Sequence, residues 1–441
     1  MAMTDQRDNS RNVVITGIGI VSPLGIGVDD FAGKLADGAS GIGPIDLLDF
    51  SAAPSNMGGQ VHEFTEKSAR KQYLKAQRKS IKVMCREIQM GVASASLAIE
   101  HSAVDLEQID HNRFGVDFGA NLMLSPPMAL KDACWKCVEE NGAGRQFHYD
   151  KWGPDGLTSM EPLWLLRYLP NMPACHIGIA ADARGPNNSI TLDEASGNLA
   201  VGEAFRIIVR NRADIMIAGT TGTRLHPVKT IHAALWDELA ESDGPPETWC
   251  RPFDLNRSGQ VVAEGSGSFI LEEESHAKNR GAKIFGALLG AGSSCVWDAA
   301  GKPNERLALV NAMRAALRDA GMAPEDIGHI NAHGLGQHVS DRNEALAIQD
   351  VFGSYTEKLP VTAFKSYFGN AGSGCGPLEL AGSLLGLERG VVLPTLNYTT
   401  PDPECPLAVV HGEPLPVDNK TFMSVNVTRV GQASVLIGTG A

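Results

Sequence analysis

Short apolar runs alternate with longer segments of helical periodicity along most of the chain, and this pattern predicts strands and helices in turn. Glycine-rich or polar stretches separate the segments, the first of them at Gly17-Ile18-Gly19, where we expect a turn. The expected strands are 13–16, 114–118, 214–218, 267–273, 283–290, 328–332, 360–363, 421–427 and 433–438, and the expected helices are 29–35, 80–100, 195–211, 304–320, 341–351 and 374–388.

The order of these elements predicts the α/β class, with a mostly buried sheet built from strands that alternate with helices. The elements before and after residue 275 are similar in kind, which indicates two related halves, 1–275 and 276–441. Residues 120–180 are irregular and rich in Pro, Trp and Met, so we interpret them as an insertion in the first half. No Ser/Gly linker separates the halves, and one compact unit is expected.

Charge and composition exclude several classes of function. The chain has 441 residues and a net charge of −13, which argues against binding to nucleic acid or an anionic membrane. No apolar run reaches the roughly 18 residues of a membrane span, and residues 1–12 lack the apolar core of a signal peptide, so we expect a cytoplasmic protein. The eight cysteines are scattered and no metal-binding motif occurs, so no metal is expected.

Three predicted strand-to-loop junctions carry polar residues beside glycine or small residues. They are 189–194, 331–334 and 365–370. Ligands of α/β sheets bind at the carboxyl ends of strands, so these segments are expected to share one pocket.

The same segments belong to a set of motifs that covers nearly the whole chain. The set comprises 14–25 (VITGIGIVSPLG), 251–254 (RPFD), 263–267 (AEGSG), 331–334 (NAHG) with Asp341 and Glu344, Lys365-Ser366 with Gly369, Gly376 and Glu379, and 394–397 (PTLN). In order and spacing it resembles the β-ketoacyl-acyl carrier protein synthases, the condensing enzymes of fatty acid and polyketide synthesis.

The resemblance implies a thiolase-like fold, with duplicated α/β halves in five layers (α/β/α/β/α), and a dimer. It also implies acyltransferase chemistry. In such enzymes a cysteine at a strand-to-helix elbow attacks an acyl thioester, two histidines assist decarboxylation of malonyl-carrier protein, and backbone N–H groups hold the oxyanion. No cofactor is implied, because the substrates are carried on the phosphopantetheine of acyl carrier protein.

This chain departs from that pattern at its chemical positions. Glu194 stands at the elbow cysteine and Asn370 at the second histidine, whereas His333 and Lys365 are retained. The loops that would contact the pantetheine arm and hold the oxyanion also differ. The substrate-binding positions affected are Leu335, Gln337, Gln260, Thr428 and Val430.

Each of these residues also has a plain structural interpretation. Glu194 can stabilise a helix N-terminus by about 0.3–1 kcal/mol, and as a nucleophile it is a poor choice. It could imitate a neutral donor only if burial kept it protonated. His333 is either a pocket residue or a buried, hydrogen-bonded histidine, and Asn370 could still donate a hydrogen bond to a carbonyl oxygen. Cys375 is interpreted as packing in a loop of small residues.

Three hypotheses of function follow. The first is a non-condensing partner of a cysteine-containing ketosynthase, in the manner of a chain-length factor, which shapes an acyl tunnel across a homodimer or heterodimer interface. The second is an enzyme with altered acyl chemistry, decarboxylation or transfer, that uses His333, Asn370 and Glu194. The third is a protein that binds an acyl ligand without turnover.

Overall fold

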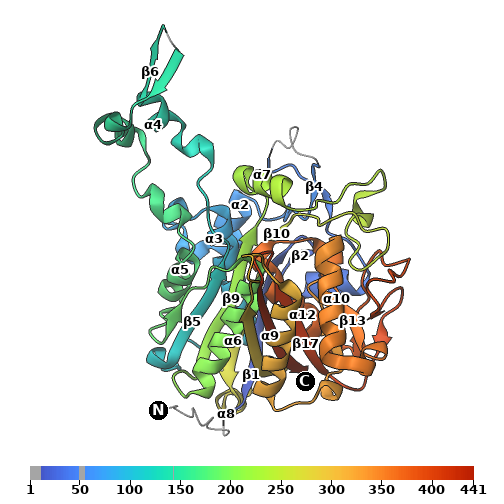
Figure 1. The fold of residues 1–441 in the computed structure, drawn as a ribbon. Coiled ribbons are helices and arrows are strands. Elements are labelled where there is room, and N and C mark those ends of the chain that lie inside the picture. Colours follow the sequence, from blue (N-terminus) through green and yellow to red (C-terminus); the bar gives the residue numbers. More distant parts are fainter. Residues whose placement is uncertain (1–10, 49–54, 143) are drawn as a thin grey trace.

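The structure is a computed structural model that describes residues 11–48, 55–142 and 144–441 (Figure 1). Most of the N-terminal segment in which we expect no signal peptide therefore lies outside the described residues. Among the residues that are described, no helix is both long and apolar enough to cross a membrane.

The strands of the first half form one sheet in which spatial neighbours are distant in sequence. From the inner edge of the sheet outward, the first two pairs of neighbouring strands are antiparallel and the next two pairs are parallel. In that order the strands are β1 (Val13–Ser22), β10 (Glu264–Glu273), β9 (Ile215–Thr223), β5 (Phe114–Ala120) and β8 (Asn187–Asn188).

The second half repeats this arrangement with the same strand directions. Its strands are β11 (Gly286–Cys295), β18 (Gln432–Gly440), β17 (Thr421–Val427), β12 (His329–Asn331) and β13 (Pro360–Thr362), with β15 (Ala408–Val409) beyond them. A short antiparallel contact between β1 and β11 joins the two sheets along their inner edges.

Helices separate and cover the two sheets, and the layers can be followed in Figure 1. α3 (Arg86–Ser102) and α5 (Met172–Ala181) pack on the first sheet, and α9 (Glu305–Ala320), with α10 (His338–Phe352) beside it, packs on the second. α6 (Ser196–Val209) and α12 (Cys375–Glu388) pack on each other and touch strands of both sheets. The expected duplicated arrangement of α/β/α/β/α layers is confirmed. We propose that the halves divide near residue 275, between β10 and β11.

The other α-helices and strands of the described residues are shorter. They are α1 (Val28–Ala36), α2 (Glu66–Ser68), α4 (Lys131–Lys136), α7 (Pro227–Trp236), α8 (Glu274–Asn279), α11 (Lys365–Phe368), β2 (Gly25–Ile26), β3 (Gly43–Pro44), β4 (Met57–Gly58), β6 (Val138–Asn141), β7 (Gly144–Phe147), β14 (Val391–Val392) and β16 (Leu415–Pro416).

The turn expected at 17–19 is wrong, because β1 continues through it to Ser22. A Cβ atom on Gly17 would lie 2.4 Å from the carbonyl oxygen of Ala98, and one on Gly19 only 1.9 Å from that of Ser94. Both carbonyls belong to α3. These glycines therefore serve close packing of a strand against a helix and not a change of chain direction.

The insertion is shorter than expected. Residues 172–181 form the regular helix α5, whose buried Ala174, Ile177 and Ala181 belong to the same core cluster as the apolar residues of α3. The excursion proper, residues 121–171, is called the arm below. It carries α4 and the β6–β7 hairpin and projects away from the body (Figure 1).

Two predicted boundaries move for local reasons. The helix expected from residue 80 begins at Arg86, because Met84 and Cys85 have extended backbone angles. The strand expected over 283–290 begins at Gly286 and continues to Cys295, paired with β18 along its length.

Gly19→Ala should destabilise the protein, because the new methyl group has no space beneath α3 and overpacking costs about 1–3 kcal/mol. Gly33→Ala is the matched control, since a Cβ there meets nothing within 4 Å and alanine favours the α1 helix. Thermal unfolding followed by circular dichroism should show a lower midpoint for Gly19→Ala only. Equal midpoints for the two variants would contradict the packing argument.

Candidate functional site

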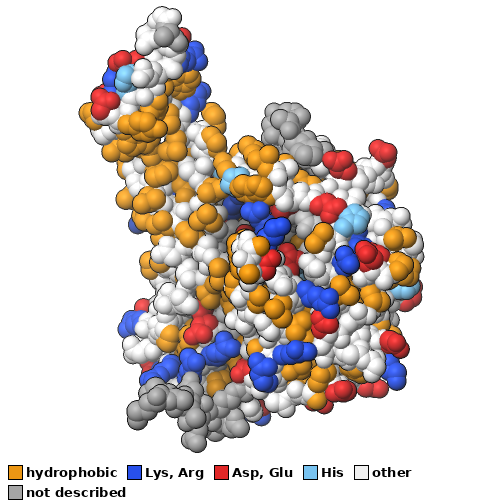
Figure 2. Space-filling model, in the orientation of Figure 1, with side chains coloured by type: hydrophobic (Ala, Val, Ile, Leu, Met, Phe, Trp, Pro, Cys, Tyr) orange, Lys and Arg blue, Asp and Glu red, His pale blue; other side chains and the backbone are white. Residues whose placement is uncertain are grey.

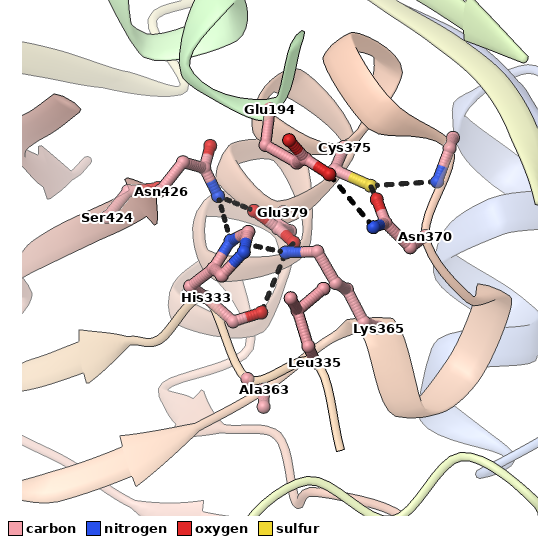
Figure 3. A network of polar contacts seen from close by, with 12 residues as sticks. Glu194, His333, Leu335, Ala363, Lys365, Asn370, Cys375, Glu379, Ser424 and Asn426 are labelled. Carbon is pink, nitrogen blue, oxygen red and sulfur yellow. Dashed lines mark hydrogen bonds and ion pairs between the residues drawn. The ribbon is translucent and has the colours of Figure 1, made fainter. Parts of the chain in front are cut away.

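The structure brings the predicted site residues together where the strands of the two halves end (Figure 3). Glu194 lies in the turn that leads into α6, His333 follows β12, and Lys365 and Asn370 follow β13. All four side chains are buried. They form two groups, His333 with Lys365 and Glu194 with Asn370.

A buried lysine organises the histidine. The Nζ of Lys365 donates to the backbone oxygen of His333 at 2.7 Å, contacts its Nδ1 at 3.1 Å and forms an ion pair with Glu379. The second oxygen of Glu379 accepts from Asn426 at 2.7 Å. Because the lysine ammonium can only donate, Nδ1 accepts and the ring proton resides on Nε2.

His333 is therefore a neutral donor. Burial lowers its pKa well below the usual value, and the charges of Lys365 and Arg224 lower it further. Its Nε2 is buried and makes no hydrogen bond within the described residues. The ring thus holds one buried N–H that no described residue uses.

Two acids fix the loop after His333. Glu344 accepts from the backbone N–H groups of His333 at 2.7 Å and Gly334 at 2.9 Å, and Asp341 accepts from that of Gly336 at 3.1 Å. Both glycines have positive φ, 42° and 80°, which side chains disfavour. Burial raises the pKa of Glu344 to about 8. These contacts give Glu344 an architectural role.

Glu194 forms a buried ion pair with Arg224, which lies just beyond the end of β9. The Nδ2 of Asn370 donates to the same carboxylate at 3.0 Å. It also donates to the side-chain oxygen Oε1 of Gln260 at 2.6 Å. Arg224 also lies 3.5 Å from Asp237. Burial raises the pKa of Glu194, but Arg224 and the Asn370 amide outweigh it, so the pKa lies below the usual value.

Two expectations about chemistry are therefore corrected. Glu194 is held as a carboxylate by Arg224, so it cannot imitate a neutral donor through protonation. Asn370 uses its amide N–H groups on Glu194 and Gln260, which leaves none for a substrate carbonyl.

The five expected substrate-binding residues divide in two groups. Leu335, Gln337 and Gln260 line a small cavity in front of Glu194. Thr428 is buried and bonds within its own loop, and Val430 is exposed, so neither lines that cavity. Val427 and Arg429 of the same loop line it instead, together with Asp193, Glu194, Arg224, Asp237, Glu305 and Ser340.

Arg224, Asp237 and Asn426 are site residues that the sequence argument missed. Arg224 stands at the carboxyl end of a buried strand, as the predicted junction residues do, and that signal could have found it.

Cys375 is buried at the start of α12, where its Sγ accepts from the N–H of Ala371 at 3.1 Å. Burial raises its pKa to about 12, which keeps the thiol protonated. In the described ranges, no group of His, Cys, Asp or Glu could hold a metal ion.

Glu194→Leu should destabilise the protein by about 3–5 kcal/mol, because it removes the carboxylate that is paired with the buried Arg224. Glu194→Leu/Arg224→Leu should cost less than the two single changes together. Glu274→Gln is a control, since its pair with Lys278 is half exposed and contributes about 0–1 kcal/mol. Thermal midpoints measured at neutral pH check the cycle, and additive costs would contradict a strong pair.

The pair also predicts a pH dependence. The folded pKa of Glu194 is depressed, so its contribution is present above the unfolded pKa of about 4.3 and is lost as the pH falls through the folded value. The difference in midpoint between the natural protein and Glu194→Gln should therefore shrink below about pH 4. A difference that stays constant down to pH 2 would contradict an ionised Glu194.

Comparison with known proteins matches the chain to one family over most of its length. The family model for the Beta-ketoacyl synthase, N-terminal domain matches residues 10–277, and that for the C-terminal domain matches residues 286–399. The chain is 34% identical to 3-oxoacyl-[acyl-carrier-protein] synthase 2 of Coxiella burnetii, over 94% of this chain and 95% of that protein. It is 32% identical to the Synechocystis protein of the same name, over 91% and 92%.

Solved structures of ketosynthases have a similar fold. A β-ketoacyl synthase from Burkholderia phymatum has a TM-score of 0.84 at 26% identity, and the ishigamide ketosynthase/chain length factor has 0.82 at 26%. A type II PKS ketosynthase in complex with its acyl-carrier protein, bound to the hexaketide, has 0.79 at 28%. Each comparison covers 98% of this chain and 100% of the other. This chain belongs to the beta-ketoacyl synthase family of fatty acid and polyketide synthesis.

Proposed function

We propose that the protein is a non-condensing member of its family that acts as the partner subunit of a cysteine-containing ketosynthase. One observation carries the proposal. The place where a condensing enzyme needs a nucleophile holds Glu194, ionised and bound to Arg224 and Asn370. A carboxylate held in this way attacks no thioester, and it repels an incoming malonyl carboxylate.

The size of the cavity supports the same proposal. The space in front of Glu194 measures about 20 Å³, enough for about one water molecule. Arg224, Gln260 and Leu335 are among the residues that line this space. Such a subunit would shape an acyl tunnel at an interface, while carrier-bound acyl groups react in its partner. The cytoplasm remains the expected compartment.

The outer edge of the first half supports a protein partner. β8 ends the sheet, and no strand of the described residues pairs with its outer edge; proteins usually cover such an edge. The apolar side chains of the arm are prominent in Figure 2. Exposed large hydrophobic residues occur along the arm and beside β8, at Leu122, Met128, Trp135, Tyr149, Leu157, Leu163, Leu165, Ile179 and Leu192. We assign a cysteine-containing ketosynthase as the occupant, since the ishigamide neighbour pairs a ketosynthase with a chain length factor.

The absence of condensation can be tested with malonyl-carrier protein and an acyl-carrier protein, analysed by intact-protein mass spectrometry. The natural protein should gain no acyl group and release no elongated product. Glu194→Cys in a Cys375→Ala background should become acylated, while Glu194→Ala in that background should not. An elongated product made by the natural protein would overturn the proposal.

The partner can be tested by native mass spectrometry after co-expression with cysteine-containing ketosynthases of the same organism. We expect a one-to-one heterodimer. Ile179→Asp should weaken it at least tenfold, because a charge replaces an exposed isoleucine near β8. Leu307→Asp, on the outer helix α9, is the matched control. A stable homodimer that binds none of these ketosynthases would contradict the assignment.

One observation favours a second function, decarboxylation of a malonyl group. The unused Nε2–H of His333 is a buried, neutral donor of the kind that stabilises an enolate oxygen. This function predicts carbon dioxide release from malonyl-carrier protein that is lost in His333→Ala. Release that continues in His333→Ala, or no release from the natural protein, would exclude it.

A further inference from the structure

A cavity lies between α3 and α5, which pack side by side on the first sheet (Figure 1). It measures about 170 Å³, far more than one water molecule needs. Protein interiors hold few empty spaces of this size, because core side chains normally fill them. The lining comes from α3 with the loop after it, from α5 and from a short 3-10 turn (Lys75–Gln77).

The walls of this cavity are apolar. Val92 of α3 and Ile177 of α5 supply hydrocarbon surface, and both are buried. Ala95 and Ala181 keep the space open, since a larger side chain at either position would occupy it. Apolar cavities of about 150 Å³ bind molecules of the size of benzene. The walls therefore favour a compact apolar ligand of about that size.

The cavity has a mouth on the surface of the protein. Ala76 and Ala180 belong to its lining and are exposed to solvent. A ligand can therefore enter between the 3-10 turn and α5 without a rearrangement of the sheet beneath.

One buried polar atom in the lining has no partner. The side-chain oxygen Oε1 of Gln77 is buried and accepts no hydrogen bond within the described residues. Ser96, which is also polar, donates to the backbone oxygen of Val92 at 2.9 Å and is satisfied. A buried acceptor without a donor costs free energy, so the ligand should bring a donor to Gln77. A hydroxyl group suits either orientation of the amide, because it both donates and accepts.

We propose that this cavity binds a compact apolar molecule with a single hydroxyl group, of the size of a substituted phenol, with its apolar body between α3 and α5 and its hydroxyl at Gln77. This lining shares no residue with the cavity in front of Glu194. The site needs neither a nucleophile nor a partner subunit, so it does not depend on the function proposed above.

Isothermal titration calorimetry with the full chain tests the site, with p-cresol and p-xylene as probes. The two molecules have the same size, and a methyl group of p-xylene replaces the hydroxyl of p-cresol. p-Cresol should bind saturably to the natural protein. Gln77→Leu should weaken p-cresol at least fivefold, about 1 kcal/mol, and should leave p-xylene binding equal or tighter, because leucine keeps the apolar contact and cannot accept a hydrogen bond.

Gln349→Leu is the matched control, since Gln349 is a partly exposed glutamine of α10 outside the cavity, and it should change neither affinity. Ala180→Leu should weaken both probes at least tenfold, because the larger side chain narrows the mouth and leucine is tolerated in a helix. Ala36→Leu, at an exposed position of α1, should have no effect on either probe.

Failure of p-cresol to bind would overturn the proposal, and so would equal binding of p-cresol by Gln77→Leu and the natural protein. Binding of p-xylene alone would also overturn it, because Gln77 would then select no hydroxyl group. Circular dichroism of each variant separates loss of binding from loss of folding. All titrations use this chain without a partner, so a negative result would leave the proposed partner function untouched.

Discussion

The buried ion pair between Glu194 and Arg224 is the constraint on which the site depends. A carboxylate taken out of water needs a partner of opposite charge and full hydrogen bonding, and the cost of removing one partner exceeds the value of the pair itself. Arg224 comes from the end of β9 and Glu194 from the start of α6. The pair therefore ties a strand of the first sheet to the helix that separates the two sheets.

A second buried ion pair, between Lys365 and Glu379, lies within the second half of the chain. It orients His333 and fixes the tautomer of the ring, although no nucleophile stands opposite. The site thus contains two buried ion pairs, one that orients His333 and one that holds Glu194 as a carboxylate. The contacts of Glu194 with Arg224 and Asn370 need the carboxylate, so this residue is integrated into the structure of the site.

Much of the fold could be predicted from the sequence, because apolar periodicity and duplicated element order both follow from burial against a sheet. The continuation of β1 through residues 17–19 could not be predicted. Glycine occurs both where a chain turns and where a helix packs closely on a strand, and the sequence alone does not distinguish the two. The site residues themselves were found at strand ends. Their protonation and bonding could not be found, because these depend on Arg224, some 30 positions away from Glu194.

The duplication has a consequence for the order in which the chain can fold during synthesis. α6 packs on β5 and β9 of the first half and on α12, β11 and β18 of the second, so one of its faces is covered only by the second half. At about 5–20 residues per second, the nascent first half waits on the order of ten seconds for that cover. During this interval the ribosome-bound chain exposes a large hydrophobic surface. The protein should therefore be a client of chaperones that bind emerging chains.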